Sequence, residues 1–282
     1  MVDSPPPAPP AAVAPAEAPL DRRVVLEVRS AEQKIFVVDE GRLRMLRFGS
    51  ETGDDQSGID LDDDKRVVFE YVRLALAPVV LLPHPPARAL VIGLGAGSWP
   101  RALVAAYPRV QVDAVEIDPV VVDVAQRFFG LVRQPRLHIH VADGAGFIAK
   151  TSRAAAAAYD VVLVDAFSGS GIPDALRTER FFSDLHARLR PEGIVVANVA
   201  LLDEGETRQV IDRFAEAFFD CVILRGRDDD NRIVVGRRAG AGPALLTPAH
   251  VRARLQRGAS PFSFPLDSSL LAVESCAAER HE

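Results

Sequence analysis

The sequence predicts an α/β protein built on a doubly wound, mainly parallel sheet of seven strands, preceded by a small antiparallel β unit. An apolar run over 89–92 leads into three alternating glycines, Gly93, Gly95 and Gly97. A second apolar run ends in Glu116, 23 residues after Gly93. Further apolar runs alternate with amphipathic segments. Buried apolar runs that alternate with helical patterns indicate β-α repeats in one parallel sheet.

Composition excludes several classes of protein. At 282 residues and 48% hydrophobic, the chain suits one large domain, or one domain with an appendage. A net charge of −6 argues against a nucleic-acid partner. No apolar run reaches the roughly 18–20 residues of a membrane span. Cys221 and Cys276 lie far apart and offer neither a disulfide framework nor a metal cluster, so we expect a cytoplasmic protein.

The first part of the chain divides into two segments. Residues 1–20 are rich in proline and alanine and lack the charge pattern of a signal peptide, so we expect a disordered tail. Residues 21–61 form the small β unit. Its predicted strands cover 24–28, 34–38 and 42–48, and a polar loop over 49–61 contains Gln56.

Residues 62–240 are predicted to form the main domain. Asp62–Asp64 precede apolar residues at helical spacing and suit the first turn of a helix, which ends at Pro78. A C-terminal extension over 241–282 is weakly patterned, with a short helix near 247–256 and a partly disordered end. Beyond the glycine strand and its helix over 98–107, we expect strands near 110–117, 136–142, 159–166, 193–199, 221–225 and 231–237, with helices near 119–129, 145–157, 175–190 and 204–219. Only one of these strands is expected to be antiparallel.

The carboxyl ends of the predicted strands indicate a nucleoside site. Ligands of such sheets bind outside these ends, where glycines allow close backbone approach. Glu116 is placed to accept both ribose hydroxyls, with Ile117 beside it. Asp143 and Gly144 follow the third strand and fit the edge of an adenine ring, although Asp143 equally suits a helix N-cap. We therefore expect an adenosine-containing cofactor.

Asp165 is the candidate catalytic residue. It follows an apolar strand and precedes a Gly/Ser-rich loop, as expected for a general base or an amine anchor, and a loop-capping role is the alternative. His138 and His140 share one face of a strand, which we interpret as structural because two ligands do not make a zinc site. The spacing of the sequence predicts no metal site.

The series of motifs resembles the spermidine synthase (polyamine aminopropyltransferase) family from about residue 24 to residue 238. These motifs are Gly-Leu-Gly-Ala-Gly, Val-Glu-Ile-Asp-Pro, Ala-Asp-Gly-Ala-Gly-Phe and Tyr-Asp-Val-Val-Leu-Val-Asp-Ala-Phe. The resemblance implies the Rossmann-like fold of class I S-adenosylmethionine-dependent methyltransferases. It also implies that Gln56 closes the cofactor site from the N-terminal unit, and that the chain forms a homodimer through its N-terminal strands.

Three departures from the family concern its amine site. Family members usually carry Asp where this chain has Ala96, and a second Asp where it has Ser168, the position that faces the substrate. They also carry a Tyr at a position that we align with Val68. An Asp beside the donor favours the bare ammonium of decarboxylated S-adenosylmethionine and repels the carboxylate of the intact form. Its loss therefore favours S-adenosylmethionine as the cofactor.

The sequence accordingly predicts a transferase that binds S-adenosylmethionine or its decarboxylated form. We expect methyl transfer to a small-molecule amine or hydroxyl, with Asp165 orienting or deprotonating the nucleophile. A polyamine aminopropyltransferase is the alternative. A non-catalytic nucleoside-binding protein is a second alternative, in which an Asp165→Asn substitution would be silent.

Overall fold

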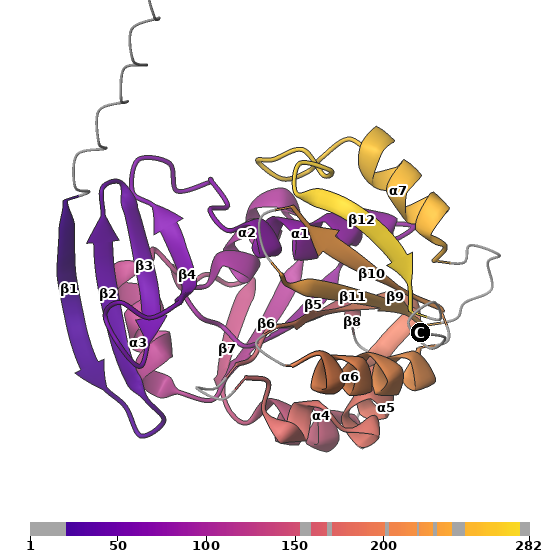
Figure 1. Ribbon diagram of the computed structural model, residues 1–282, viewed down its shortest axis with the longest axis horizontal. Helices are drawn as coiled ribbons and strands as arrows, with labels where there is room; N and C mark the ends of the chain where they lie inside the picture. Colours follow the sequence, from indigo (N-terminus) through magenta and orange to yellow (C-terminus); the bar gives the residue numbers. More distant parts are fainter. Residues whose placement is uncertain are drawn as a thin grey trace, which may run out of the picture.

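The computed structural model describes residues 21–152, 159–167, 171–200, 203–218, 220–227, 230–238 and 246–276. The predicted tail over 1–20 and the candidate substrate residue Ser168 lie outside the described residues. Two sheets make up the fold, a small one at one end of the molecule and a large one with helices on both faces (Figure 1). None of the helices in the described ranges is long and apolar enough to cross a membrane.

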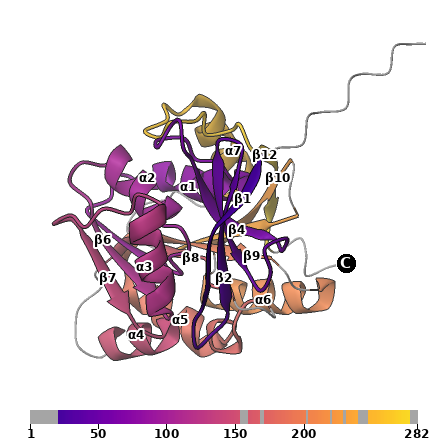
Figure 2. The ribbon, with the colours of Figure 1, turned by 90° about the vertical axis from the view of Figure 1, so that its left-hand side faces the viewer.

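The small sheet is antiparallel throughout. Its strands, in spatial order, are β1 (Arg22–Arg29), β2 (Lys34–Glu40), β3 (Leu43–Phe48) and β4 (Asp55–Asp60). Ile35, Val37 and Leu46 alternate along β2 and β3, and their fully buried side chains pack against Val121 and Phe129. Figure 2 views the molecule from the side of this sheet and shows α3 (Pro119–Phe128) beside it. The small sheet therefore packs against α3 and the loop that contains Ala96.

Strand β4 corrects the predicted loop over 49–61. Polar residues and glycine dominate this segment, so it has little intrinsic preference for a strand. It pairs with β3, with Ser57 opposite Leu46 and Asp60 opposite Leu43, and a bulge at Gln56 shifts the register so that Asp55 lies opposite Arg47. The hydrogen bonds of this pairing, rather than side-chain pattern, make the segment a strand. As a result Gln56 and Ser57 are held on a fixed backbone.

The large sheet has the order β12-β10-β11-β9-β8-β5-β6-β7. Strands β5 to β9 pair in parallel, and β11 and β12 run against their neighbours. The predicted α/β class is confirmed, but an eighth strand, β12, makes two antiparallel strands instead of one. The strands are β5 (Arg88–Ile92), β6 (Gln111–Glu116), β7 (Leu137–Val141), β8 (Tyr159–Val164), β9 (Leu189–Val199), β10 (Asp220–Gly226), β11 (Arg232–Arg237) and β12 (Leu270–Ser275).

Helices cover both faces of this sheet (Figure 1). Residues of β5 alternate between the two cores, with Val91 facing one and Leu90 and Ile92 facing the other. The first core takes α1 (Glu70–Leu76), a 3₁₀ turn (Ala77–Leu81), α2 (Ser98–Ala106) and α7 (Pro248–Arg257). The second takes α4 (Gly144–Ser152), a 3₁₀ turn (Asp174–Leu176), α5 (Glu179–Arg188) and α6 (Glu204–Ala217).

Helix α1 begins later than predicted, at Glu70 rather than near Asp62. The carboxylate of Asp60 accepts the backbone N–H of Asp62, and that of Asp63 accepts the backbone N–H of Lys65. Such local bonds compete with helix formation and hold the acidic run as turns. The prediction of a helix was correct, but its first turn was placed about two turns too early.

Cys221 and Cys276 form a disulfide, which corrects the expectation that they stay apart. Cys276 follows β12, which pairs with β10 so that Val222 lies opposite Ser275 and the two cysteine Cα atoms are 5.7 Å apart. The weakly patterned extension thus joins the edge of the large sheet through residues 246–276. The disulfide also removes the argument for a reducing compartment, so the cytoplasmic location stays a prediction.

Candidate active site

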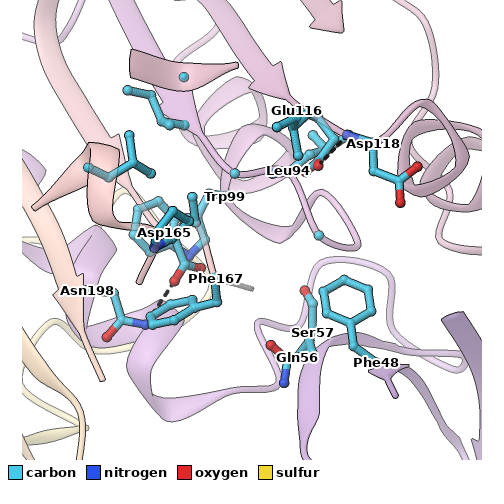
Figure 3. A pocket seen from close by; sticks show the side chains of 18 of the residues that line it. Phe48, Gln56, Ser57, Leu94, Trp99, Glu116, Asp118, Asp165, Phe167 and Asn198 are labelled. Atoms are coloured by element: carbon cyan, nitrogen blue, oxygen red, sulfur yellow. Dashed lines mark hydrogen bonds between the residues drawn. The ribbon is translucent and has the colours of Figure 1, made fainter. Parts of the chain in front are cut away.

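A pocket of about 540 Å³ lies at the carboxyl ends of the parallel strands. Its floor comes from the segments that follow β5, β6, β7 and β8, and one wall comes from the small sheet. Figure 3 shows Phe48, Gln56 and Ser57 on one side of this space, facing Asp165 and Glu116 on the other. The site is therefore shared between the two sheets.

The glycine loop has a geometry that larger residues do not adopt. Gly93 has φ +90°, and a Cβ at this position would lie 2.0 Å from the carbonyl oxygen of Asp165. Gly97 has φ +78°, and a Cβ there would lie 2.8 Å from Leu131. Gly93 and Gly95 line the pocket, whereas Gly97 begins α2 behind it. Gly93 thus lets the backbone after β5 approach the backbone after β8, and Gly97 acts in packing rather than in the pocket that we expected it to line. Contact of Gly93 and Gly95 with a cofactor stays a prediction.

Glu116 is buried at the end of β6 and is held by backbone donors. Its carboxylate accepts the N–H groups of Leu94, at 2.9 Å, and of Asp118, at 3.0 Å. Burial raises the pKa of Glu116, and these backbone hydrogen bonds lower it. A third backbone hydrogen bond comes from Ile117, and the role of this carboxylate as acceptor of ribose hydroxyls stays a prediction. Ile117 lines the pocket with 54% of its surface exposed, which suits contact with an aromatic ring.

Asp143 and Gly144 lie where the sequence placed them, at the pocket end of β7. The carboxylate of Asp143 accepts the N–H of Gly146 at 2.6 Å, so the N-cap that we weighed as the alternative is present. Both residues also line the pocket. Capping uses one of the two carboxylate oxygens, so it does not conflict with a contact to adenine through the other one. That contact stays a prediction.

Asp165 follows β8 directly and reaches into the pocket between two neutral donors. The Nδ2 of Asn198 donates to its Oδ1 at 2.9 Å (Figure 3), and the hydroxyl of Tyr71 contacts the same carboxylate. Burial raises the pKa of Asp165 to about 6, while the hydrogen bonds from Asn198 and Tyr71 lower it. This carboxylate is therefore suited to exchange a proton near neutral pH.

Tyr71 corrects the alignment that put Val68 at the tyrosine position of the family. Val68 precedes α1, whereas Tyr71 is its second residue and lines the pocket. Its hydroxyl also lies 2.8 Å from the backbone carbonyl oxygen of Gln56, so its single proton is shared between this oxygen and Asp165, and the contact joins α1 to the small sheet. The tyrosine is present, and the misplaced start of α1 concealed it. An aromatic hydroxyl in the helix after the Gln56 loop was the available signal.

Other pocket residues carried no sequence signal. Asn198 sits on β9, Trp99 is 3% exposed in the first turn of α2, and Phe48 comes from the small sheet. Ala96, by contrast, is fully buried in the cluster beneath the small sheet and does not line the pocket.

His138 and His140 lie elsewhere, against the buried carboxylate of Asp113. Nε2 of His140 is 2.9 Å from Asp113 Oδ1, and Nδ1 of His138 is 3.7 Å from it. Tyr159 and Arg88 donate to the other carboxylate oxygen. This agrees with a structural role for both histidines. Within the described ranges, no group of three or more candidate ligands could hold a metal ion.

The charged side chains that line the pocket are acidic. Among the described residues that line it, no side chain is basic and seven are carboxylates. One of these, Asp55, is neutralised by Arg47 at 2.6 Å. The remaining carboxylates give the cavity a negative potential, which attracts cationic ligands. The seven are Glu32, Asp54, Asp55, Glu116, Asp118, Asp143 and Asp165.

Comparison with known proteins agrees with this geometry. Residues 70–224 match the family model "Spermine/spermidine synthase domain". The polyamine aminopropyltransferase of Vibrio vulnificus (strain CMCP6) is 32% identical over 257 residues, which are 89% of this chain and 82% of that protein. A probable spermidine synthase from Corynebacterium glutamicum has the same fold, with a TM-score of 0.69, 20% identity and coverage of 92% and 93%. The structure of human methyltransferase-like protein 13 in complex with SAH is also similar, with a TM-score of 0.61 and 29% sequence identity. The match covers 67% of this chain and 92% of that one.

The fold, the glycine loop and the acidic pocket define an enzyme that transfers an alkyl group from S-adenosylmethionine or its decarboxylated form. Within that class, the chain belongs to the spermine/spermidine synthase family. The structure holds a single chain, so the homodimer stays a prediction.

Proposed function

We propose that this protein is a polyamine aminopropyltransferase that uses decarboxylated S-adenosylmethionine as donor and a small primary amine as acceptor. The charge of the pocket carries the proposal. This donor has a sulfonium and an ammonium, and its acceptor is an ammonium at neutral pH, so both substrates are purely cationic at their reacting ends. A cavity lined by carboxylates and by no described basic side chain suits both.

Asp165 is the residue to which we assign the proton chemistry. Its carboxylate attracts the acceptor's ammonium and removes the proton that blocks the nitrogen lone pair. The donor's sulfonium supplies a good leaving group, so the protein mainly aligns the two substrates and excludes water. The hydroxyl of Tyr71 lies 2.8 Å from the backbone carbonyl oxygen of Gln56. Together these two residues close the pocket beside Asp165, on the side of the small sheet.

The position of Ala96 is the reason to prefer aminopropyl transfer to the methyl transfer expected from the sequence. That expectation treated residue 96 as part of the donor site. Its side chain instead packs with Ile35 and Val121 beneath the small sheet. The loss of an Asp at this position therefore says little about the charge of the donor, whereas the carboxylates that do line the pocket favour a cationic one.

A transfer assay with both donors tests the proposal. Purified protein is incubated with 1,4-diaminobutane and either decarboxylated or intact S-adenosylmethionine, and the amine products are identified by mass spectrometry. We expect an added aminopropyl group from the decarboxylated donor and tighter binding of that donor by calorimetry. Methylated amine from the intact donor, with no aminopropyl product, would overturn the proposal.

One observation favours methyl transfer as a second candidate. Trp99 Nε1 is a buried hydrogen-bond donor with no partner in the described part of the chain, and Trp99 lines the pocket. A carboxylate on the donor, which only intact S-adenosylmethionine carries, would satisfy it. A Trp99→Phe substitution would then weaken binding of the intact donor by about 10-fold and leave the decarboxylated donor unaffected.

A further inference from the structure

A second cavity, of about 420 Å³, lies beside the candidate active site. Ser98, the first residue of α2, lines both cavities, and Arg101 of the same helix lines the second. Most of the remaining wall comes from the segment before α1 and from the segment between α3 and β7. A space of this size can hold a small organic molecule.

The charge of this cavity is opposite to that of the active site. Among the residues that the structure describes, four basic side chains and a single carboxylate line it. Arg66 is neutralised by the buried carboxylate of Asp60, because its Nη1 lies 2.7 Å from Oδ2. The other three basic side chains form no ion pair within the described ranges and leave a surplus of positive charge, in a chain whose net charge is −6. These three are Lys65, Arg101 and Arg136.

Main-chain carbonyl groups hold the two arginines in place. Arg101 donates to the carbonyl oxygens of Phe129 at 2.6 Å and of Asp64 at 3.0 Å, and Arg136 donates to that of Tyr107 at 3.3 Å. These bonds cap the C-terminal ends of α3 and α2, which is a structural role. Carbonyl oxygens carry no net charge, however, so capping fixes the guanidinium groups without cancelling their charge. Burial lowers the pKa of Arg101, and the nearby carboxylate of Asp64 raises it only in part.

The uncompensated groups can be reached from solvent. Lys65 is exposed, and Arg101 and Arg136 are half-buried. Gly130 leaves the guanidinium of Arg101 uncovered on one side, where a Cβ would lie 4.0 Å from its Nη1. Val132, which is 70% exposed, adds an apolar surface to the same cavity. The cavity therefore offers a ligand both cationic groups and an apolar contact.

We propose that this cavity binds a phosphate monoester of about the size of a mononucleotide, whose phosphate is held by Lys65, Arg101 and Arg136. Three cationic side chains against the one carboxylate of Asp64 leave a surplus of two positive charges. A phosphate monoester carries about 1.5 to 2 negative charges at neutral pH, whereas a carboxylate carries only one. The N–H groups of a guanidinium also match the spacing of phosphate oxygens. The inference does not rest on the proposed function, because it concerns binding alone.

Calorimetric titration with uridine 5′-monophosphate and with uridine tests the inference. The two probes differ only in the phosphate, and neither contains the adenine that we expect the nucleoside site to bind. We expect one molecule of the monophosphate to bind per chain, no measurable binding of uridine, and competition by inorganic phosphate. Because the contacts are ionic and open to solvent, the affinity should fall as NaCl rises from about 50 to about 500 mM.

Single substitutions locate the bound phosphate. Lys65→Gln and Arg136→Gln should each weaken binding of the monophosphate by about 3- to 10-fold. The matched control is Arg109→Gln, which removes the same charge from an exposed arginine that does not line the cavity, and it should change the affinity by less than about 2-fold. Circular dichroism shows whether each variant folds. If Arg136→Gln does not fold after losing its cap on α2, the exposed Lys65→Gln decides.

Three results would overturn the inference. The first is no binding of the monophosphate, and the second is an equal loss of affinity in Lys65→Gln and Arg109→Gln. The third is displacement of the monophosphate by S-adenosylmethionine or its decarboxylated form, because it would place the probe in the active-site pocket instead. Failure of the transfer assay would overturn the proposed function and would leave these binding measurements unchanged.

Discussion

At the scale of single residues, the site depends on one carboxylate with an altered proton affinity. Asp165 lies in an apolar strand end, and burial raises its pKa from 3.8 to about 6 even though Asn198 and Tyr71 both stabilise the ionised form. Its folded-state pKa exceeds its unfolded value, so this group favours the folded state most at low pH, and that contribution is lost as pH rises to about 6. A residue that costs stability when ionised is common at functional sites.

Activity should follow the ionisation of Asp165. Because only the carboxylate attracts an ammonium and accepts its proton, we expect kcat/KM to rise with pH and to level above about 6. Asp165→Asn should lower kcat by about 10²- to 10⁴-fold and change donor affinity little. A pH-rate profile and calorimetry check both points. Full activity in Asp165→Asn would contradict the role assigned to Asp165, whereas donor binding without any turnover in the wild-type protein would support the non-catalytic alternative.

At the scale of elements, the turn after β5 is the feature that the sequence specified most firmly. Its positive φ angles and the close approach of the Asp165 backbone leave no room for a side chain at Gly93. The start of α1 and the strand β4 were specified less firmly. The acidic run before α1 and the segment of β4 both consist of polar residues, whose conformation depends on the partners of their hydrogen bonds.

Two glycines with similar backbone angles separate conformational strain from crowding. Gly93 has φ +90° and a backbone atom 2.0 Å from its missing Cβ, whereas Gly49 has φ +78° and nothing within 4 Å. We expect Gly49→Ala to lower the free energy of unfolding by about 1 kcal/mol, and Gly93→Ala by about 3 kcal/mol or more with loss of donor binding. Urea denaturation measures both. Equal costs would contradict the crowding argument.

At the scale of the whole molecule, segments far apart in the chain complete the fold and the site. The small sheet supplies Phe48, Gln56 and Ser57 to a pocket whose floor belongs to the large sheet. The C-terminal extension adds β12 to the far edge of the large sheet, and the disulfide closes a loop of 55 residues between Cys221 and Cys276.

The disulfide should contribute measurably to stability. Closing a loop of 55 residues restricts the unfolded chain, which corresponds to about 4 kcal/mol. Addition of a reductant should therefore lower the Tm of the wild-type protein, while a Cys276→Ser variant should melt at the lower temperature with or without it. Calorimetry in oxidising and reducing buffer makes the comparison. A wild-type Tm that does not respond to reductant would contradict the prediction.

The sequence by itself determined the features that are set locally. The periodicity of apolar residues specified the parallel strands and most helices, and the glycines specified the turn after β5. The position of a carboxylate at a strand end was enough to bring Glu116 and Asp165 to the same edge of the sheet. These features follow from backbone geometry within a few residues, so no distant partner was needed to predict them.

The tertiary structure alone decided the remaining features. Asn198 meets Asp165 because β9 pairs with β8, and Cys276 meets Cys221 because β12 pairs with β10. Tyr71 on α1 meets Gln56 on β4, although α1 belongs to the core of the large sheet. Each contact joins residues on different elements, and its formation depends on how the whole chain buries its apolar faces. The residues next to each of these positions in the sequence do not indicate its distant partner. The contacts around Asp165 could therefore be described only from the tertiary structure.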